Sequence, residues 1–529
     1  MALADYYERA ALAAAHALTG GFEGTQFRQR LEETPVGIAL DGSVSSSREG
    51  RVIADLTVRL LARLYPTLSI VAADGAADEG QPFEELARRI NPSIEITSEP
   101  ATLGVAIGSS PSPFSETIFV GSQGWDAYVS TAEPQPLGDS PLPYGAGAAA
   151  CLACANLFRR IFTDDWPQTA DESLVFSTFD LTREPTLGAP QIPEKTEEPV
   201  VLVGLGAIGN AAAWALSRTP LLGELHLIDG ETVELSNLQR YVLALRENEG
   251  DVKVTVASAL FERAPGLTAQ PQHMTWAEFA SLFGYAWPRV LLALDSAADR
   301  RSVQASLPRW IANSWTQPGD LGVSIHPAFT EAGACVSCLY LQDQVMPNQD
   351  ELYAAALGIP EMIPQVRQFL HTGEGLPPPF LDLIAERLEQ PPPVLGRFVG
   401  RPIRELYIEG ICGGAVLPLG AAGVPDASLH VPLAHQSALA GVLLAAAYMR
   451  SISASPFAET RIVRLDLLRQ LAGVEPLPTM KKGDRRCICE DADYRNVYLK
   501  KWSAPKPRGR AKPKPSPSKT RPGGSAASG

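Results

Sequence analysis

Residues 199–243 read PVVLVGLGAIGNAAAWALSRTPLLGELHLIDGETVELSNLQRYVL, and this stretch decides the fold. Its first five residues form an apolar run rich in β-branched side chains, which predicts a buried parallel strand. Gly204, Gly206 and Gly209 follow at GxGxxG spacing, ahead of an alanine-rich stretch with helical character. A strand, a glycine-rich turn and a helix in this order predict a nucleotide-binding α/β unit.

The glycine-rich turn predicts a site for phosphate. Glycine lets the backbone turn tightly and approach an anion, and the following helix N-terminus offers free N–H groups and a positive dipole. Residues 224–228 predict a second strand that ends in Asp229, roughly 20 residues beyond the glycines, where a carboxylate accepts ribose hydroxyls. Alone, this motif fits NAD, FAD, S-adenosylmethionine or no ligand.

Polar residues beyond Asp229 narrow the choice of ligand. Asn237 and Arg240 lie three residues apart, and Lys253 follows a short way further on. A dehydrogenase performs its chemistry on the nicotinamide and has no need of this cluster, whereas an enzyme that cleaves a triphosphate needs cations near the phosphates. A further apolar run, within residues 291–303 (LLALDSAADRRSV), ends in Asp295.

These stretches resemble the adenylation domain of the ThiF/MoeB and ubiquitin-activating enzyme superfamily. The resemblance implies ATP and Mg²⁺ as cofactors, with Asp229 on the ribose and Asp295 on the metal and the reacting phosphate. It places Asn237, Arg240 and Lys253 on the phosphates, and it makes Arg240 and Asp295 catalytic. The full nucleotide-binding set that it implies is Gly204, Gly206, Ala207, Ile208, Gly209, Asp229, Asn237, Arg240, Lys253 and Asp295.

Composition bounds the class of protein. The chain has 529 residues, of which 45% are hydrophobic and 20% charged, as in a soluble globular protein of three or four domains. The formal net charge is -14 although residues 503–529 carry only basic charges, so the body is acidic and nucleic acid is not expected as a partner. We find no apolar stretch of membrane-spanning length and no secretory signal, which predicts a cytoplasmic protein without a membrane partner.

The N-terminal part predicts a nucleotide fold that lacks its motif. A strand at 36–40, a helix at 51–64 and a strand at 68–72 repeat the opening of the central stretch, but residues 41–43 (DGS) make a poor phosphate cradle. Ubiquitin-activating enzymes resemble this arrangement, with an inactive and an active half related by a pseudo-twofold axis. The resemblance implies a pseudo-dimer within one chain, whose inactive half lends an arginine to the nucleotide; the candidates are Arg28 and Arg30. An unrelated α/β domain is the alternative.

Four cysteines predict a structural metal site. Cys335 and Cys338 form a CxxC pair, which follows an expected helix at 302–312, and Cys487 and Cys489 form a CxC pair near the C-terminus. Together they can make a tetrahedral four-thiolate zinc site, which leaves no open position for water. ThiF and MoeB proteins have similar pairs, although their second pair is CxxC. The alternative is four reduced thiols.

The remaining cysteines differ in their expected roles. Cys151 and Cys154 lie on one face of an expected helix and are interpreted as small core residues. Cys412 stands alone in IEGICGGAVLP, where relatives have a cysteine that takes up the activated carrier. Such a nucleophile needs an exposed thiolate of lowered pKa, and the nearby His430 and His435 either assist it or pack in the core.

The predicted fold class is α/β. We expect a Rossmann-like adenylation domain, an N-terminal degenerate and inactive copy of the same fold, a helical insertion and a zinc-stapled C-terminal segment. A Thr- and Pro-rich stretch at 175–191 is interpreted as a connector. The expected domains are residues 1–190 (inactive copy), 195–343 (active domain, first part), 344–411 (helical catalytic-cysteine insertion), 412–502 (active domain, second part with zinc segment) and 503–529 (disordered basic tail).

The overall resemblance is to the activating component of bacterial ubiquitin-like conjugation operons, some of which act in antiphage defence. It implies adenylation of the C-terminal glycine of a ubiquitin-like protein, thioester formation on Cys412 and transfer to a ubiquitin-conjugating-type enzyme. The alternatives are ThiF/MoeB-type adenylation for sulfur-carrier proteins, an NAD-dependent Rossmann oxidoreductase, and a scaffold whose nucleotide site only stabilises the fold.

Overall fold

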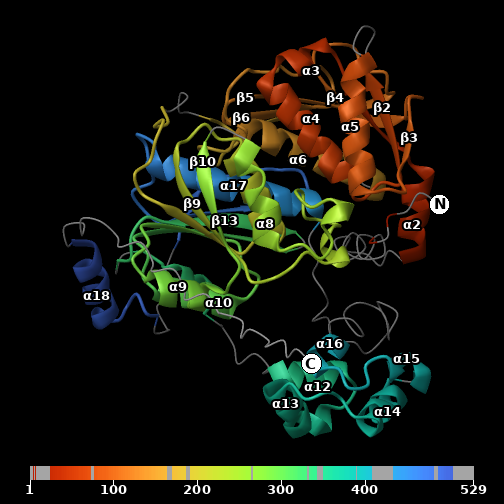
Figure 1. Ribbon diagram of the computed structural model, residues 1–529. Helices are drawn as coiled ribbons and strands as arrows, with labels where there is room; N and C mark the ends of the chain where they lie inside the picture. Colours follow the sequence, from red (N-terminus) through yellow and green to blue (C-terminus); the bar gives the residue numbers. More distant parts are fainter. Residues whose placement is uncertain are drawn as a thin grey trace, which may run out of the picture.

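The chain forms two α/β units and a separate helical lobe in this computed structural model (Figure 1). We call the part of the chain up to residue 185 the N-terminal unit, and the part from residue 191 that forms the second sheet the central unit. The structure describes Ala4, Tyr6 and residues 24–72, 77–163, 170–185, 191–263, 266–317, 319–330, 333–341, 349–388, 390–407, 433–479, 481 and 487–503.

The N-terminal unit contains a seven-stranded sheet in the order β3-β2-β1-β4-β5-β6-β7. The first five strands of this order are parallel, and β6 and β7 are antiparallel. Its strands are β1 (Val36–Leu40), β2 (Thr67–Ala72), β3 (Glu95–Thr97), β4 (Leu103–Ile107), β5 (Glu116–Gln123), β6 (Asp126–Ser130) and β7 (Ser173–Ser177). Its described helices are α2 (Gly24–Glu33), α3 (Gly42–Ser46), α4 (Arg48–Leu61), α5 (Ala77–Ile90) and α6 (Tyr144–Phe162).

The central unit contains an eight-stranded sheet in the order β10-β9-β8-β11-β12-β13-β14-β15. Again the first five strands of the order are parallel and the rest antiparallel. Its strands are β8 (Val200–Val203), β9 (Gly223–Ile228), β10 (Leu267–Gln272), β11 (Arg289–Leu292), β12 (Trp310–Gln317), β13 (Asp320–His326), β14 (Arg461–Leu465) and β15 (Leu477–Pro478). The expected α/β fold class with two copies of one topology is therefore confirmed.

Helices cover both faces of the central sheet, as parallel strands require. The apolar faces of α7 and α17 bury one side, and α9 and α10 cover the other through a cluster that includes Val201, Phe279 and Val303. These helices and the short turns between them are α7 (Ala207–Ser217), η1 (Leu235–Asn237), η2 (Arg246–Asn248), α8 (Lys253–Ser258), η3 (Phe261–Arg263), α9 (Trp276–Phe283), α10 (Ala297–Ala305), α11 (Val336–Leu339) and α17 (Ala434–Ile452).

Two alanine-rich helices join the units. The helix α6 lies between β6 and β7, and α17 lies between β13 and β14; each has 19 residues. The two helices pack against each other, and small residues allow a close approach. A Cβ built on Gly147 of α6 would lie 3.1 Å from Trp214 of α7 and from Val442 of α17. The two units therefore share one continuous apolar core.

Two buried arginines make matching contacts across this boundary. Arg159 in the last turn of α6 donates to the carbonyl oxygen of Leu467, two residues beyond β14, with Nη1 at 2.7 Å. Arg450 in the last turn of α17 donates to the carbonyl oxygen of Phe179, two residues beyond β7. Since β7 and β14 have equivalent places in the two sheets, a twofold axis between the units would produce this pattern.

The residues that follow Cys338 include a helical lobe with its own core, which Figure 1 shows apart from the two sheets. Buried side chains such as Leu357, Ile384 and Phe398 form that core. Its elements are α12 (Gln349–Ala356), η4 (Pro360–Met362), α13 (Ile363–Thr372), α14 (Pro378–Arg387), α15 (Pro392–Gly396) and α16 (Ile403–Glu405). A last helix, α18 (Ala492–Ser503), follows the second cysteine pair. Within the described ranges no helix is both long and apolar enough to cross a membrane.

Two expected elements are wrong. The connector predicted at 175–191 overlaps β7, whose residues pair antiparallel with β6. The helix predicted at 302–312 begins earlier and ends at Ala305, because Leu307 has a positive φ of 55° and Pro308 cannot continue a helix. Residues from Trp310 onward instead form β12 at the centre of the sheet.

Candidate functional site

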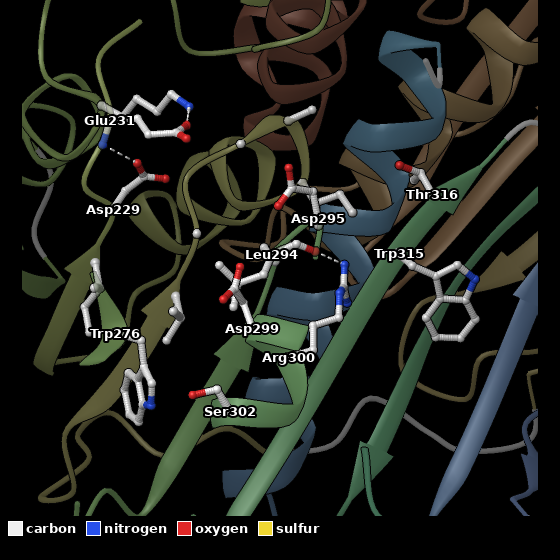
Figure 2. Close-up of a pocket in the computed structure, with 18 of the residues that line it drawn as sticks. Asp229, Glu231, Trp276, Leu294, Asp295, Asp299, Arg300, Ser302, Trp315 and Thr316 are labelled. Atoms are coloured by element: carbon white, nitrogen blue, oxygen red, sulfur yellow. Dashed lines mark hydrogen bonds and ion pairs between the residues drawn. The ribbon is translucent and has the colours of Figure 1, made fainter. Parts of the chain in front are cut away.

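A cavity of about 950 Å³ opens at the carboxyl ends of β8, β9 and β11, where the strand order reverses (Figure 2). Ligands of open α/β sheets bind at such a switch point. The cavity is lined by the glycine turn, by Asp229, and by the charged side chains of Arg240, Lys253 and Asp295. The structure thus brings most of the predicted nucleotide residues together.

The three glycines serve different purposes. Gly204 has a φ of +89°, and a Cβ there would lie 2.7 Å from the carbonyl oxygen of Ala293. Gly206 caps α7 and lines the cavity together with Ala207 and Ile208. A Cβ on Gly209 would lie only 1.9 Å from the carbonyl oxygen of Gly204. Gly209 therefore packs the helix against the turn and does not line the cavity.

Asp229 is fixed at the end of β9. One carboxylate oxygen accepts the backbone N–H of Leu205 at 2.7 Å and the other accepts that of Glu231 at 2.9 Å. Burial raises the pKa of Asp229, while Lys253 and these two hydrogen bonds oppose the rise. A carboxylate can accept about four hydrogen bonds, so acceptor capacity remains for the hydroxyls of a ribose.

Lys253 is a buried cation beside the glycine turn. Its Nζ lies 2.5 Å from Oε2 of Glu231 and 5.2 Å from the ring centroid of Tyr241. Burial alone would lower the pKa of Lys253, but Tyr241 and Glu231 outweigh that effect and raise it, so the amine stays protonated. Glu231 is itself 75% exposed, which leaves this partner at the rim of the cavity.

Asn237 does not line the cavity. Its Oδ1 accepts the backbone N–H of Glu234 at 3.0 Å, and its carbonyl oxygen accepts the N–H of Arg240 at 3.1 Å. Asn237 therefore shapes the turn from which Arg240 reaches the cavity, whereas direct phosphate contact was expected.

Two carboxylates stand at the end of β11. Asp295 and Asp299 are exposed and line the cavity, and Ser296 caps α10 by accepting the N–H of Asp299 at 3.2 Å. Magnesium takes one or two protein carboxylates together with phosphate oxygens, so these residues suit Mg²⁺ beside a triphosphate.

Arg300 follows Asp299 in α10 and holds the backbone next to this carboxylate pair. It is buried and donates to the carbonyl oxygen of Ser314 at 2.6 Å. It also donates to the carbonyl oxygen of Leu294, as Figure 2 shows. Burial lowers the pKa of Arg300. The contact with Leu294 fixes the backbone just before Asp295. The sequence placed Arg300 beyond the strand, but its role depends on the neighbouring strand β12 and was missed.

The cavity extends beyond the nucleotide residues along the antiparallel strands. Trp315 donates its indole N–H to Asp320 at 3.1 Å, and the guanidinium of Arg464 lies 5.5 Å from the Trp315 ring centroid. These residues line the same cavity. No local motif marks them, because pairing of β13 with β14 brings Arg464 to the site over more than 100 residues.

The four predicted zinc ligands converge. The Sγ atoms of Cys335 and Cys487 lie 3.5 Å apart, as do those of Cys338 and Cys489, and all four lie within 4.8 Å of one another. A tetrahedral site with Zn–S bonds of about 2.3 Å needs sulfur atoms about 3.8 Å apart. The cluster therefore fits zinc. All four thiols are buried, as a closed structural site requires.

Other predicted residues lie elsewhere. Cys412 and His430 fall outside the described residues. His435 is buried at the start of α17, and burial lowers its pKa to about 3. Arg30 donates to the carbonyl oxygen of Ile161 at 3.0 Å, and neither Arg28 nor Arg30 lines the cavity. Cys151 and Cys154 are buried in α6, as expected.

Comparisons with known proteins follow the two units. A model of the ThiF family matches residues 185–489, and a model described as Prokaryotic E2 family C matches residues 39–163. The protein described as Uncharacterized protein y4jF of Sinorhizobium fredii is 41% identical over 511 residues, which cover 95% of this chain and 98% of that protein.

Two further relatives match shorter parts of the chain. Adenylyltransferase and sulfurtransferase uba4 of Aspergillus fumigatus is 30% identical over 190 residues, 34% of this chain and 38% of that protein. The Nedd8-activating enzyme E1 catalytic subunit of Drosophila melanogaster is 31% identical over 114 residues, 21% of this chain and 25% of that protein. The chain thus spans well under half the length of these two relatives.

Among solved structures, E. coli MccB with ATP covers 56% of this chain and 68% of its own, with a TM-score of 0.34 and 14% identity. The match to the ThiF family model spans more than half of the 529 residues. The chain therefore belongs to the ThiF family, whose members are ATP-dependent adenylyltransferases.

Proposed function

We propose that this protein activates the C-terminal glycine of a ubiquitin-like protein by ATP-dependent adenylation. One observation carries the proposal: a glycine turn, a ribose-type carboxylate, two cations and two metal-type carboxylates converge on one cavity. An NAD-dependent oxidoreductase would have no use for Lys253, Arg240 or Asp295 at this position. The carrier belongs, on this proposal, to a bacterial ubiquitin-like conjugation system of the kind that acts in antiphage defence.

The first step joins the carrier to AMP. The terminal carboxylate attacks the α-phosphorus of ATP, the bond to the pyrophosphate oxygen breaks, and an acyl-adenylate and pyrophosphate form. Arg240 and Lys253 would stabilise the negative charge that moves onto the leaving pyrophosphate. Mg²⁺, held by Asp295 and Asp299, would supply further charge neutralisation at the phosphates. Asp229 would hold the ribose and so fix the α-phosphorus in line with the attacking oxygen.

In the second step we propose Cys412 as the nucleophile. Its thiolate attacks the acyl carbonyl, the bond to AMP breaks, and a thioester forms for transfer to a ubiquitin-conjugating-type enzyme. Cys412 lies outside the described residues, so this assignment rests on the sequence. The helical lobe at 349–407 lies between Cys338 and Cys412 in the chain, which suits a surface that handles the carrier during transfer.

The N-terminal unit is, on this proposal, the inactive half of a pseudo-dimer within one chain. A conjugating role, as the name Prokaryotic E2 family C suggests, would need an exposed thiolate. The matched residues 39–163 contain only two cysteines, Cys151 and Cys154, and both are buried in α6. Burial raises the pKa of both thiols, which opposes thiolate formation.

Activation of a sulfur-carrier protein is the second candidate. The match to uba4 supports it. That match spans only 34% of this chain and 38% of uba4. The N-terminal unit and the helical lobe have no assigned purpose in that reaction, which weighs against it.

The test combines the full chain with MgATP and a ubiquitin-like protein, which is the one encoded beside it if there is one. We expect pyrophosphate release that Asp295→Ala reduces at least a hundredfold, whereas Glu32→Ala, which removes an exposed carboxylate of α2 outside the cavity, leaves it unchanged. On a non-reducing gel we expect an ATP-dependent adduct that reductant removes. Cys412→Ala should abolish the adduct and Cys154→Ala should keep it.

Three outcomes would redirect the proposal. Pyrophosphate release without an adduct points to sulfur-carrier activation. An adduct that survives in Cys412→Ala moves the nucleophile to another cysteine. Tight NADH binding with no pyrophosphate release would contradict adenylation.

A further inference from the structure

Residues 239–244 form a short segment at the place where the two units meet. We call it the Arg240 segment. It carries Arg240 into the cavity and also Tyr241, whose ring lies 5.2 Å from Nζ of Lys253. A Cβ built on Gly206 would lie 3.7 Å from the hydroxyl oxygen of Tyr241. A shift of this segment would therefore displace Arg240 and the Tyr241 ring that lies beside Lys253.

The carbonyl groups of this segment are held by the N-terminal unit. Arg63, just beyond α4, donates from Nη2 to the carbonyl oxygens of Tyr241 at 2.6 Å and Ala244 at 2.7 Å. Arg59, in the last turn of α4, donates from Nη1 to the carbonyl oxygen of Val242 at 2.9 Å. Two arginines of one unit thus bind three carbonyl groups within four residues of the other, those of Tyr241, Val242 and Ala244.

Burial of the Arg63 guanidinium at this position costs free energy. It is 1% exposed, and no carboxylate of the described residues forms an ion pair with it. Burial lowers the pKa of Arg63 to about 10, which still leaves the side chain charged at neutral pH. A buried cation without a carboxylate is unfavourable unless hydrogen bonds compensate, and an apolar side chain of similar size would fill the same space without that penalty. A purpose beyond stability is therefore expected.

The helix α4 also contacts the C-terminal end of α7, the helix that follows the glycine turn. Asp55 of α4 accepts the indole N–H of Trp214 at 2.9 Å and pairs with Arg218 at 2.9 Å, at the C-terminal end of α7. Asp55 also pairs with Arg59 at 3.0 Å. One face of α4 therefore contacts both elements that bracket the triphosphate site, α7 and the Arg240 segment.

We propose that Arg63, supported by Arg59, is a positioning residue that holds the Arg240 segment so that Arg240 and Lys253 engage the triphosphate. This inference rests on the proposed function. It gives the N-terminal unit a part in catalysis that needs no cysteine, no nucleotide of its own and no arginine inside the cavity.

The test compares affinities of the full chain for MgATP and AMP by isothermal titration calorimetry. AMP lacks the β- and γ-phosphates, so a positioning role for the cations should affect ATP alone. We expect Arg63→Met to weaken MgATP binding about tenfold and AMP binding less than twofold. The matched control is Arg89→Ala, which removes an exposed ion pair to Glu247 in the same stretch of the central unit and should change neither affinity.

A double-mutant cycle supplies a readout that a purely structural role would not move. If Arg63 acts through Arg240, Arg63→Met should have less than a twofold effect on MgATP binding in the Arg240→Ala background. Should Arg63→Met fail to fold, Arg59→Met replaces it, with an expected threefold loss for MgATP and no loss for AMP.

Equal losses for MgATP and AMP, or an undiminished effect in the Arg240→Ala background, would overturn the positioning role while leaving adenylation intact. A wild-type chain that fails to prefer MgATP over AMP would instead overturn the proposed function, and this inference with it.

Discussion

The two sheets share one topology, yet they differ where their first strands end. Gly204 follows β8, and its missing side chain lets the turn approach Ala293, which follows β11. Asp41 follows β1 at the equivalent place, and Gly108 follows β4. A Cβ on Gly108 would lie 2.3 Å from the Asp41 carboxylate. In the central unit a cavity lies at the ends of these strands, whereas in the N-terminal unit the Asp41 carboxylate occupies the equivalent place.

Asp41 satisfies the backbone groups that an anion would otherwise bind. Its carboxylate accepts the N–H groups of Ser43 at 2.9 Å and of Ser109 and Ser110 at 2.8 Å each. Burial would raise the pKa of Asp41, but hydrogen bonds from Ser43 and Ser110 outweigh it and hold the pKa below its usual value. The N-terminal unit thus carries its own anion at the place where the central unit is built to receive a phosphate.

The comparison teaches which parts of a duplicated fold persist. The long helices α6 and α17, with Arg159 and Arg450, keep the joint between the units. The second sheet face has changed, since Phe114 in the N-terminal unit covers a paired Gly37 and Gly104 where the central unit has α9 and α10. Contacts between the units are retained, whereas the parts that serve the nucleotide are replaced.

Removal of the cysteine cluster should have the largest effect on stability, and this effect should begin in the central unit, to which the four cysteines belong. Cys487→Ser with Cys489→Ser leaves two of four thiolates, so zinc content should fall from one per chain to none. Structural zinc contributes on the order of 10 kcal/mol to small domains, so the segment with α18 should unfold and the chain should melt at a lower temperature. Mass spectrometry for metals and calorimetry measure both. A chain from zinc-rich medium that holds no zinc would contradict the assignment.

Glycine substitutions compare the two strand–turn–helix junctions directly. A Cβ at Gly209 would lie 1.9 Å from backbone, and the equivalent Cβ at Gly50 of α4 would lie 3.0 Å from Val44. We expect Gly209→Ala to destabilise the chain by about 3 kcal/mol and Gly50→Ala by about 1 kcal/mol. Thermal unfolding of both variants gives the order. A larger effect at Gly50 would show that the N-terminal junction is the tighter one.

Sequence reasoning found the parts of the site that local motifs carry. Asp229 and Asp295 were predictable because each ends an apolar strand, and the carboxyl ends of parallel strands meet at one edge. The cysteine pairs were predictable from their spacing. Arg464 was missed, because only the pairing of β13 with β14 brings it to the cavity. The role of Arg300 was missed, because it depends on the carbonyl oxygen of Ser314 in β12. No motif marks such contacts.

The contacts between the two units could not be predicted from the sequence for the same reason. The contacts of Arg63 with the Arg240 segment join residues about 180 positions apart, and α4 reaches α7 through the hydrogen bond between Asp55 and Trp214. The family resemblance implied that an arginine of the N-terminal unit serves the nucleotide site, with Arg28 and Arg30 as candidates. Neither of them lines the cavity, and we propose Arg63 and Arg59, which contact backbone carbonyl groups, in their place.

The stability of the chain as a function of pH tests the ion pairs that Asp55 makes at the contact between the units. Arg59 and Arg218 outweigh the burial of Asp55 and lower its pKa from 3.8 to about 2; the same burial lowers the pKa of Arg218, which stays charged. Because the folded pKa is the lower one, Asp55 contributes about 2 kcal/mol above pH 5 and loses it as the pH falls through about 4 to 1. Asp55→Asn should be less stable than the wild type by about 2 kcal/mol at pH 7, and the difference should shrink to about 0.5 kcal/mol at pH 2, where about half of the folded chains still carry the charge. Denaturant unfolding at both pH values tests this, and a difference at pH 2 as large as that at pH 7 would contradict it.

The smallest effect is expected at the thiols of the N-terminal unit. Cys154 is 3% exposed and Cys151 is fully buried, and burial raises the pKa of both. Cys154→Ala removes one sulfur atom from a packed core and should cost about 1 kcal/mol, without changing zinc content or adduct formation. In the folded chain, iodoacetamide should leave Cys151 and Cys154 unmodified, and denaturant should make both reactive; peptide mass spectrometry reads both states. Rapid labelling of Cys154 in the native chain, or a carrier thioester on it, would restore the conjugating role that the buried α6 argues against and would make the N-terminal unit a second reactive centre.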